Sequence, residues 1–240
     1  MEKIKVDNLS FSYPSSDKLA LDSVSLSIPE SEFVVLCGKS GCGKSTLLRH
    51  LKKSMNPYGN KLGSVSFDGE EIGEMSDRDA ASKIGYVQQN PDNQLVTDKV
   101  WHELAFGLES LGYSNSVIKR RVAEMASYFG IQTWFRKSVS ELSGGQKQLL
   151  NLASVMAMQP EVLILDEPAS QLDPIAARDF LSTVHRLNRE LGVTIIISEH
   201  RLEEIFPLAD RAIVMDTGRI IANAKPSEVA IQLAGSGDEE

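Results

Sequence analysis

Residues 33–46 read FVVLCGKSGCGKST, and this stretch decides the fold. Its first five residues are apolar and predict a buried strand. The residues from Gly38 to Ser45 match the pattern G-x-x-x-x-G-K-[ST] of a phosphate-binding loop. A helix is expected to begin near Lys44. A strand, a glycine-rich loop and a helix in this order are typical of an α/β fold that binds a nucleotide.

The residue types of this loop suit a polyphosphate. Gly38, Gly41 and Gly43 lack a Cβ, so the backbone can adopt positive φ and present consecutive N–H groups to phosphate oxygens. We expect the Lys44 ammonium to reach the β- and γ-phosphates and the Ser45 hydroxyl to bind Mg²⁺. ATP and Mg²⁺ are therefore the predicted ligands. The other loop residues that we expect to contact the nucleotide are Lys39, Ser40, Cys42 and Thr46.

Composition limits the class of protein. A chain of 240 residues with 42% hydrophobic residues can form one α/β domain, and a formal net charge of −8 disfavours nucleic acid as a partner. Cys37 and Cys42 predict neither a metal site nor a disulfide, which indicates a reducing cytosol. No apolar run approaches the length of about 18 residues that a membrane span needs, and the N-terminus lacks a signal peptide's apolar region. Any membrane association is therefore expected to be peripheral.

Two stretches around the loop alternate apolar and polar residues. Residues 4–13 and 24–28 predict antiparallel strands joined by the turn-rich residues 14–17. Tyr13, at the end of the first strand, is either an ordinary edge aromatic or a ring on which an adenine stacks. Residues 63–70 predict a further strand closed by an Asp-Gly turn, and residues 84–87 another.

Helical spacing dominates the middle of the chain. It runs from Asp92 to Gly130, and a further helix begins within 143–146 and continues towards Pro160, so we expect a helical subdomain over about 92–158, inserted in the core. Its apolar residues could line a groove for a partner's helix or belong to the subdomain's own core, and both interpretations stay open. The residues concerned are Leu95, Val96, Trp101 and Phe106.

Residues 162–165 are uniformly apolar and predict a strand buried on both faces of a parallel sheet. The strand ends in Asp166 and Glu167, two adjacent carboxylates that are costly to bury together unless a cation is near. We expect Asp166 to hold Mg²⁺ and Glu167 to polarise the attacking water. The alternative is a helix cap that follows a strand.

The C-terminal third predicts a helix over 174–191, capped by Asp173, and a second apolar strand over 193–198 that ends in Glu199 and His200. A lone histidine is more often structural. The carboxyl end of a parallel strand, where nucleotide sites lie, favours a role for His200 instead. A hairpin over 212–222, a helix after Pro226 and a disordered tail over 235–240 complete the prediction.

Leu142-Ser143-Gly144-Gly145-Gln146 resembles the signature of ATP-binding-cassette (ABC) ATPases and lies between the loop and Asp166, in that family's order. The resemblance covers nearly the whole chain. It implies a single ABC ATPase domain over 1–240, with the α/β fold of a P-loop NTPase: a mostly parallel sheet core, an N-terminal antiparallel β subdomain and the helical subdomain. It also implies roles for four residues: adenine stacking by Tyr13, coupling of the metal to a membrane partner by Gln89, contact across a dimer by the loop that ends at Asp173, and γ-phosphate sensing by His200.

The resemblance further implies a head-to-tail dimer with a second ABC ATPase subunit. Each ATP would lie between the glycine loop of one subunit and Ser143, Gly144 and Gly145 of the other. These residues open a helix with free N–H groups, which makes a second anion site that this chain's own loop does not need.

Residues 89–94 and 103–107 are similar to the ATPase subunits of energy-coupling-factor importers. Those importers take up vitamins, cobalt or nickel through a transmembrane coupling protein and a substrate-binding membrane protein, so we expect this chain at the cytoplasmic face of the cell membrane. Gln88 and Leu149 depart from the family pattern. Leu149 replaces an arginine that commonly follows the signature, which leaves open whether both composite ATP sites are active.

The chain could serve another class of ABC transporter, a non-transport ABC ATPase of DNA repair or translation, or a regulator that binds ATP without hydrolysis. Repair enzymes separate loop and signature with a long coiled coil, translation factors carry two cassettes, and a regulator should lack the carboxylate of Glu167. The sequence does not name the transported solute, nor decide between a homodimer, a heterodimer and a fused tandem.

Overall fold

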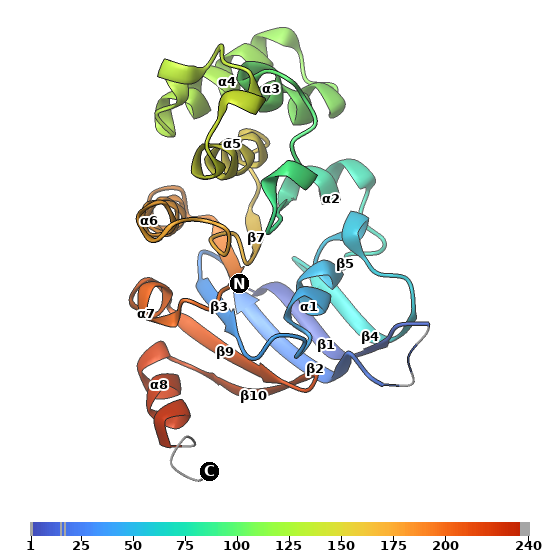
Figure 1. Cartoon of the computed structure of the whole chain (residues 1–240). Helices are drawn as coiled ribbons and strands as arrows, with labels where there is room; N and C mark the ends of the chain where they lie inside the picture. The colour runs from blue at the N-terminus through green and yellow to red at the C-terminus, as the bar shows by residue number, and fades with distance from the viewer. Residues whose placement is uncertain (1, 15, 17, 236–240) are drawn as a thin grey trace.

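A computed structural model describes residues 2–14, 16 and 18–235 (Figure 1). Of the disordered tail predicted over 235–240, Gly235 instead ends helix α8, and the rest lies outside the described residues, as do Ser15 and Asp17 of the first turn. Near the N-terminus the chain forms an antiparallel sheet in the order β2-β1-β4-β5. Its strands are β1 Glu2–Ser12, β2 Leu21–Pro29, β4 Asn60–Phe67 and β5 Glu70–Glu71, as the alternating pattern and the Asp-Gly turn predict.

A larger sheet has the order β10-β9-β3-β8-β7-β6. The strand that precedes the glycine loop, β3 Phe33–Cys37, lies inside it, between β9 Arg211–Asp216 and β8 Thr194–Ser198. β7 Val162–Asp166 and β6 Ile84–Val87 continue the parallel arrangement, and β10 Arg219–Ala224 closes it in the antiparallel sense. Every residue of β3, β7 and β8 is buried, which explains why these strands carry continuous apolar runs instead of an alternating pattern.

Helices cover this sheet, and three of them form the helical part at the top of Figure 1. These three are α3 Val100–Ser110, α4 Asn115–Tyr128 and α5 Gly144–Ala157. The others are α1 Lys44–His50, α2 Asp77–Lys83, α6 Pro174–Leu191, α7 Leu202–Ile205 and α8 Pro226–Gly235. Single 3-10 turns occur at Lys53–Met55, Pro91–Asn93, Ile131–Trp134, Val139–Glu141 and Phe206–Leu208. Within the described ranges, no helix has the length and apolar character that crossing a membrane requires.

The two faces of the larger sheet pack into two different cores. Val35 on β3 faces the cluster formed with the helical part and α6, whereas its neighbours Val34 and Leu36 face the cluster formed with α1 and the antiparallel sheet. This alternation along one strand places the sheet between two layers. The helical part shares its core with the sheet, and its status as a subdomain over 92–158 stays a prediction.

The prediction of helical structure from Asp92 onward was wrong at its start. Beyond the 3-10 turn, residues 95–97 form neither helix nor strand, and α3 begins only at Val100. The buried carboxylate of Glu103 explains this, because its Oε2 accepts the N–H groups of Val96 at 3.1 Å and Thr97 at 2.8 Å. These two donors are satisfied outside a helix.

Candidate functional site

The glycine loop borders a cavity at the carboxyl ends of the parallel strands. The cavity has a volume of about 500 Å³, and a smaller one of about 360 Å³ adjoins it beside Tyr13 and Lys39. The chain therefore brings together side chains that are more than 150 residues apart in sequence. Predicted residues in the wall of the larger cavity are Tyr13, Ser40, Gly41, Gly43, Lys44, Ser45, Thr46, Gln89 and Glu167.

The loop has the geometry that its glycines predict. Gly38, Gly41 and Gly43 have φ of 142°, 79° and 108°. A Cβ on Gly38 would lie 2.1 Å from the carbonyl oxygen of Met215, so this position has no space for a side chain. Lys44 Nζ donates to the carbonyl oxygens of Gly38 at 2.8 Å and Lys39 at 3.2 Å, which closes the loop from within. No side chain caps α1 at Gly43, so none competes for the N–H groups of its first turn.

Three hydroxyl groups hold the Asp166 carboxylate. Its Oδ1 accepts from Ser45 Oγ and Ser198 Oγ, both at 2.9 Å, and its Oδ2 accepts from the Tyr86 hydroxyl at 3.1 Å. Burial, reinforced by the charge of Asp166, raises the pKa of Tyr86. Ser45 and Asp166 are adjacent oxygen donors, which suits a hard cation such as Mg²⁺. Within the described ranges, no group of three or more His, Cys, Asp or Glu is placed to bind a metal.

Glu167 lies beside Asp166 in sequence but faces different partners. Its φ of 47° is in the left-handed region, which is uncommon for a glutamate. Its N–H donates to the carbonyl oxygen of Ser198 at 3.1 Å and to Ser198 Oγ at 3.0 Å, which fixes this turn of the backbone. Its Oε1 lies 2.8 Å from His200 Nε2, and its Oε2 accepts from Gln89 Nε2 at 3.3 Å. A carboxylate held in this way at the wall of the cavity can accept a proton from a water molecule there.

His200 itself is held through its backbone. Glu199 is buried, and its Oε2 accepts the N–H groups of His200 at 2.8 Å and Arg201 at 3.2 Å. Arg201 Nη2 donates to the carbonyl oxygen of Leu172 at 2.9 Å. The His200 segment is thereby joined to the loop that ends at Asp173.

Tyr13 lies at the junction of the two cavities. Its hydroxyl is 3.1 Å from Thr46 Oγ1, and its ring meets the edge of Phe11 at a centroid distance of 4.9 Å. These contacts fix the ring beside the loop. That an adenine stacks on it stays a prediction.

The predicted signature residues do not line the loop cavity. Ser143 caps α5 in a capping box, in which its N–H donates to Gln146 Oε1 at 3.0 Å and its Oγ accepts from the Gln146 N–H at 3.3 Å. Ser143 and Gly144 are exposed. Asp173 caps α6 by accepting the N–H groups of Ile175 and Ala176 at 3.0 Å each, and it too is absent from the cavity wall.

Hydrogen bonds connect α5 to the segment that contains Gln89. Gln148 Nε2 donates to the carbonyl oxygen of Gln88 at 3.1 Å, and Asn151 Nδ2 donates to Gln94 Oε1 at 3.0 Å. Lys147 Nζ adds an ion pair with Asp92 at 2.7 Å. The helix that begins at the signature is thus joined to a residue in the cavity wall.

Three residues of this network were not predicted as site residues: Tyr86, Ser198 and Glu199. Tyr86 and Ser198 were assigned only to strands, and Glu199 only to the end of one. Their contacts with Asp166, Glu167 and His200 depend on which strands are neighbours and in what register. No local pattern in the sequence carries that information.

Comparisons with known proteins agree on one family. The family model described as ABC transporter matches residues 21–170. A Bacillus thuringiensis protein, provisionally named as an ABC transporter ATP-binding protein, is 50% identical over 229 residues; the match covers 95% of this chain but only 42% of that protein. The chain thus spans less than half the length of this relative.

Solved structures show the same fold. CbiO1 from Clostridium perfringens, described as part of the ABC transporter complex cbiONQ, superposes with a TM-score of 0.86 and 32% identity, covering 97% of this chain and 92% of that one. MJ1267 in its ADP conformation, an ATP-binding cassette of an ABC transporter, gives a TM-score of 0.83 with 25% identity, covering 98% and 95%. The predicted fold class, an ABC-type P-loop NTPase with an antiparallel sheet beside a mostly parallel core, is confirmed. The chain belongs to the ABC transporter family, as one of its ATPase domains.

Proposed function

We propose that the chain binds and hydrolyses ATP to power the import of a small solute, a vitamin or a transition-metal ion, through an energy-coupling-factor ABC transporter. The observation that carries the hydrolysis is the position of Glu167. Its carboxylate lines the loop cavity, separated from the buried Asp166 and held by His200 and Gln89. This is the arrangement that a water-activating base beside a bound triphosphate needs.

The site residues have different roles in this proposal. The loop residues 38–46 contact the phosphates, and Tyr13 stacks on the adenine. Ser45 and Asp166, with Gln89 nearby, hold Mg²⁺, which neutralises phosphate charge when bound. Glu167 activates water and His200 contacts the γ-phosphate.

A second ABC ATPase subunit completes each site in this proposal. Ser143, Gly144 and Gly145 are at a helix N-terminus where the dipole favours an anion, yet they lie outside the cavity of their own chain. They would instead contact the ATP of a second cassette, with Asp173 at the same interface. A copy of this chain or a related cassette could supply the partner.

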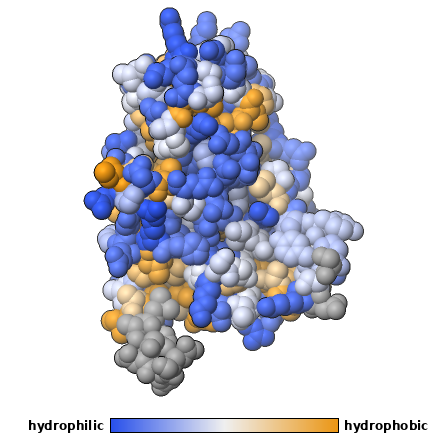
Figure 2. All heavy atoms as spheres, in the orientation of Figure 1, coloured by the Kyte–Doolittle hydropathy of each residue, from blue (hydrophilic) through white to orange (hydrophobic). Residues whose placement is uncertain are grey.

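The membrane partner would dock on the helical part, which we propose acts as a subdomain over about 92–158. The four candidate groove residues differ in their exposure to solvent. Leu95 packs against the core, whereas Val96, Trp101 and Phe106 are 62%, 44% and 43% exposed. Val96 and Phe106 line a surface hollow of about 520 Å³ with His102 and Glu109 at its polar rim. Figure 2 shows hydrophobic atoms among hydrophilic ones over this upper part of the molecule.

The similarity to CbiO1, itself part of an ABC transporter complex, supports partners of the energy-coupling-factor type. These are a transmembrane coupling protein and a substrate-binding membrane protein, with this chain bound peripherally at the cytoplasmic face. Exposed apolar residues in a hollow with polar surroundings suit the docking of such a partner's helix.

The test is co-purification with the membrane partner, followed by ATP-dependent uptake. Val96→Glu should abolish both while ATP binding by the isolated chain stays unchanged, because the side chain is exposed and lies away from the glycine loop. Leu62→Glu is the matched control, since Leu62 is 73% exposed on β4 and should tolerate the same charge. A Val96→Glu variant that keeps assembly and uptake would refute this docking surface. Co-purification of the chain with ribosomes or DNA, without membrane proteins, would refute the transport function itself.

A further inference from the structure

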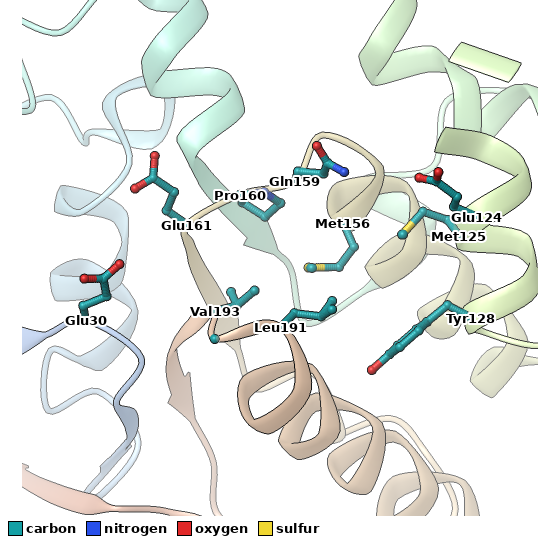
Figure 3. A pocket seen from close by; sticks show the side chains of 11 residues that line it. Glu30, Glu124, Met125, Tyr128, Met156, Gln159, Pro160, Glu161, Leu191 and Val193 are labelled. Carbon is teal, nitrogen blue, oxygen red and sulfur yellow. The ribbon is translucent and has the colours of Figure 1, made fainter. Parts of the chain in front are cut away.

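A further cavity lies far along the strands from the glycine loop, at their amino ends (Figure 3). Its volume is about 580 Å³, within the range of roughly 300 to 1,000 Å³ that small-molecule sites have. Pro160 and Glu161, just before β7, and Val193, just before β8, are part of its wall. The same strands end at Asp166 and Ser198 in the nucleotide site. The cavity is thus separate from that site, and strands β7 and β8 run from one to the other.

Much of the cavity wall is apolar. Met125 comes from α4, Met156 from α5 and Leu191 from the end of α6. Figure 3 shows Met156 between Met125 on one side and Val193 and Leu191 on the other. Thioether side chains adapt to the shape of what they contact, so this wall suits an apolar body of variable form.

The charged residues that line the cavity are all acidic. Three carboxylates line it, from Glu30, Glu124 and Glu161, and its lining includes no lysine or arginine. Glu161 is paired with Lys3 at 2.7 Å. Glu124 has a single ion pair of 3.8 Å with Arg120 within the described ranges, and Glu30 has no hydrogen bond or ion pair with any described residue. Two rim carboxylates are therefore available to a cation.

Helix ends add to this negative potential. α4 ends at Tyr128, α5 at Ala157 and α6 at Leu191, all at or beside the cavity, and a helix carboxyl end carries a partial negative charge. Arginines outside the lining compensate part of it: Arg186 reaches the Tyr128 carbonyl oxygen at 3.4 Å, and Arg121 reaches that of Ala157 at 3.5 Å. The carboxylates of Glu30 and Glu124 in the lining itself keep the rim attractive to a cation.

We propose that this cavity binds a small organic amine with an apolar body. The apolar body would lie against Met125, Met156 and Val193, and the ammonium group would pair with Glu30 or with Glu124, which Figure 3 places on opposite sides. This proposal is independent of the transport function above.

Such a ligand would join the helical part to the sheet. Two contacts already join α4 of the helical part to α6: the Tyr128 hydroxyl donates to Glu190 Oε2 at 2.9 Å, and the Arg186 guanidinium lies over the Tyr128 ring at 4.8 Å. A ligand that touches α4, α6 and the start of β8 at once adds to them. It should raise the thermal stability of the chain and alter ATP turnover without competing with ATP.

The experiment is a titration of chain labelled with ¹³C at the methionine methyl groups, followed by NMR. The probes are 4-phenylbutylamine, the neutral 4-phenylbutanol and the anionic 4-phenylbutyrate. We expect the amine to shift the Met125 and Met156 signals saturably and to leave Met75 and Met215, which pack in the other core, unmoved. The alcohol should bind about fivefold more weakly, because it lacks the ion pair, and the carboxylate more weakly still.

Charge variants locate the ammonium group. Either Glu30→Gln or Glu124→Gln should weaken amine binding about fivefold while leaving alcohol binding unchanged, and Glu74→Gln, an exposed carboxylate elsewhere, should do neither. Met125→Trp or, if that variant does not fold, the exposed Leu191→Trp should fill the cavity and block all three probes. No shift of Met125 and Met156 at millimolar amine, equal binding of amine and carboxylate, or indifference to both glutamine variants would overturn the proposal.

Discussion

The glycine loop and the segment Ser143–Gly145 both start a helix with glycines, but for different reasons. In the loop, Gly38 and Gly43 have positive φ, and a Cβ on either would lie within 2.6 Å of a backbone oxygen. Gly144 is not among the positive-φ residues, and no atom lies within 4 Å of where its Cβ would be. The fold itself therefore requires the loop glycines but not Gly144. We infer that Gly144 allows something outside the chain to approach closely.

The two regions are also stabilised differently. Around the loop, buried polar groups hold one another, among them Lys44, Asp166 and Ser198. The signature segment is exposed and capped by its own residues, above an apolar core. Substitutions near the loop should thus affect folding and chemistry together, whereas those in the signature should affect chemistry alone.

The largest effect should follow Glu167→Gln. The amide keeps the size of the side chain but cannot accept a proton, so ATP turnover should fall by about a thousandfold in the assembled complex. Nucleotide affinity should not change, because the phosphate contacts remain. Phosphate release and equilibrium ATP binding measure the two quantities, with Glu74→Gln as the control. Wild-type turnover in this variant would refute the role of Glu167.

Gly144→Asp tests the comparison directly. The space around Gly144 should let this variant fold, and an acidic residue in the first turn favours a helix. ATP binding by the isolated chain should be unchanged, while turnover of the assembly should fall about 10- to 100-fold because the carboxylate repels the partner's phosphates. Gly144→Ala, which adds a Cβ without charge, should show a much smaller loss. Equal losses in both variants would mean that space, not charge, matters here.

Local patterns predicted the loop, the buried strands, a helix start within 143–146 and the cap at Asp173, because each depends on residues close in sequence. They did not predict that Ser198 would join Asp166 to Glu167, a hydrogen bond that spans 32 residues, or that Tyr86 would reach Asp166 across 80. Such contacts follow from strand order. Nor did helical spacing separate Leu95 from Val96, because the stretch that holds them is not helical: Leu95 packs against the core, whereas Val96 is exposed. The functional roles of the site residues remain predictions until variants are measured.

Ser198→Ala should have an intermediate effect. The Ser198 hydroxyl is fully buried, donates to Asp166 and accepts from the Glu167 N–H, so its loss removes one hydrogen bond from each of these two groups. We expect a loss of about 1–3 kcal/mol in the free energy of unfolding and weaker Mg²⁺-dependent ATP binding. Ser110→Ala, an exposed serine on α3, serves as the matched control in denaturant unfolding. An unchanged Mg²⁺ dependence would show that Ser198 is structural only.

The smallest effect concerns Lys52, a buried ammonium group just after α1. Its Nζ donates to the carbonyl oxygens of Ala80 at 2.7 Å and Ala81 at 3.2 Å and to that of Ile84, which joins α1 to the end of α2. Burial lowers the pKa of Lys52 from 10.5 to about 8. Between these two values the unfolded chain binds more protons than the folded one, so the free energy of unfolding should rise with pH.

The carbonyl acceptors favour the charged form and oppose this shift, so we expect a rise of about 1 kcal/mol between pH 8 and 10.5. Below pH 8 Lys52 is protonated in both the folded and the unfolded chain, so it does not change the free energy of unfolding with pH. Denaturant unfolding across this range should show the rise in the wild type and in Lys53→Met, whose lysine is partly exposed, but not in Lys52→Met. If the free energy of unfolding rises equally with pH in the wild type and in Lys52→Met, the buried Lys52 is not part of what sets the loop region apart. The contrast with the signature segment then depends on Asp166 and Ser198 alone.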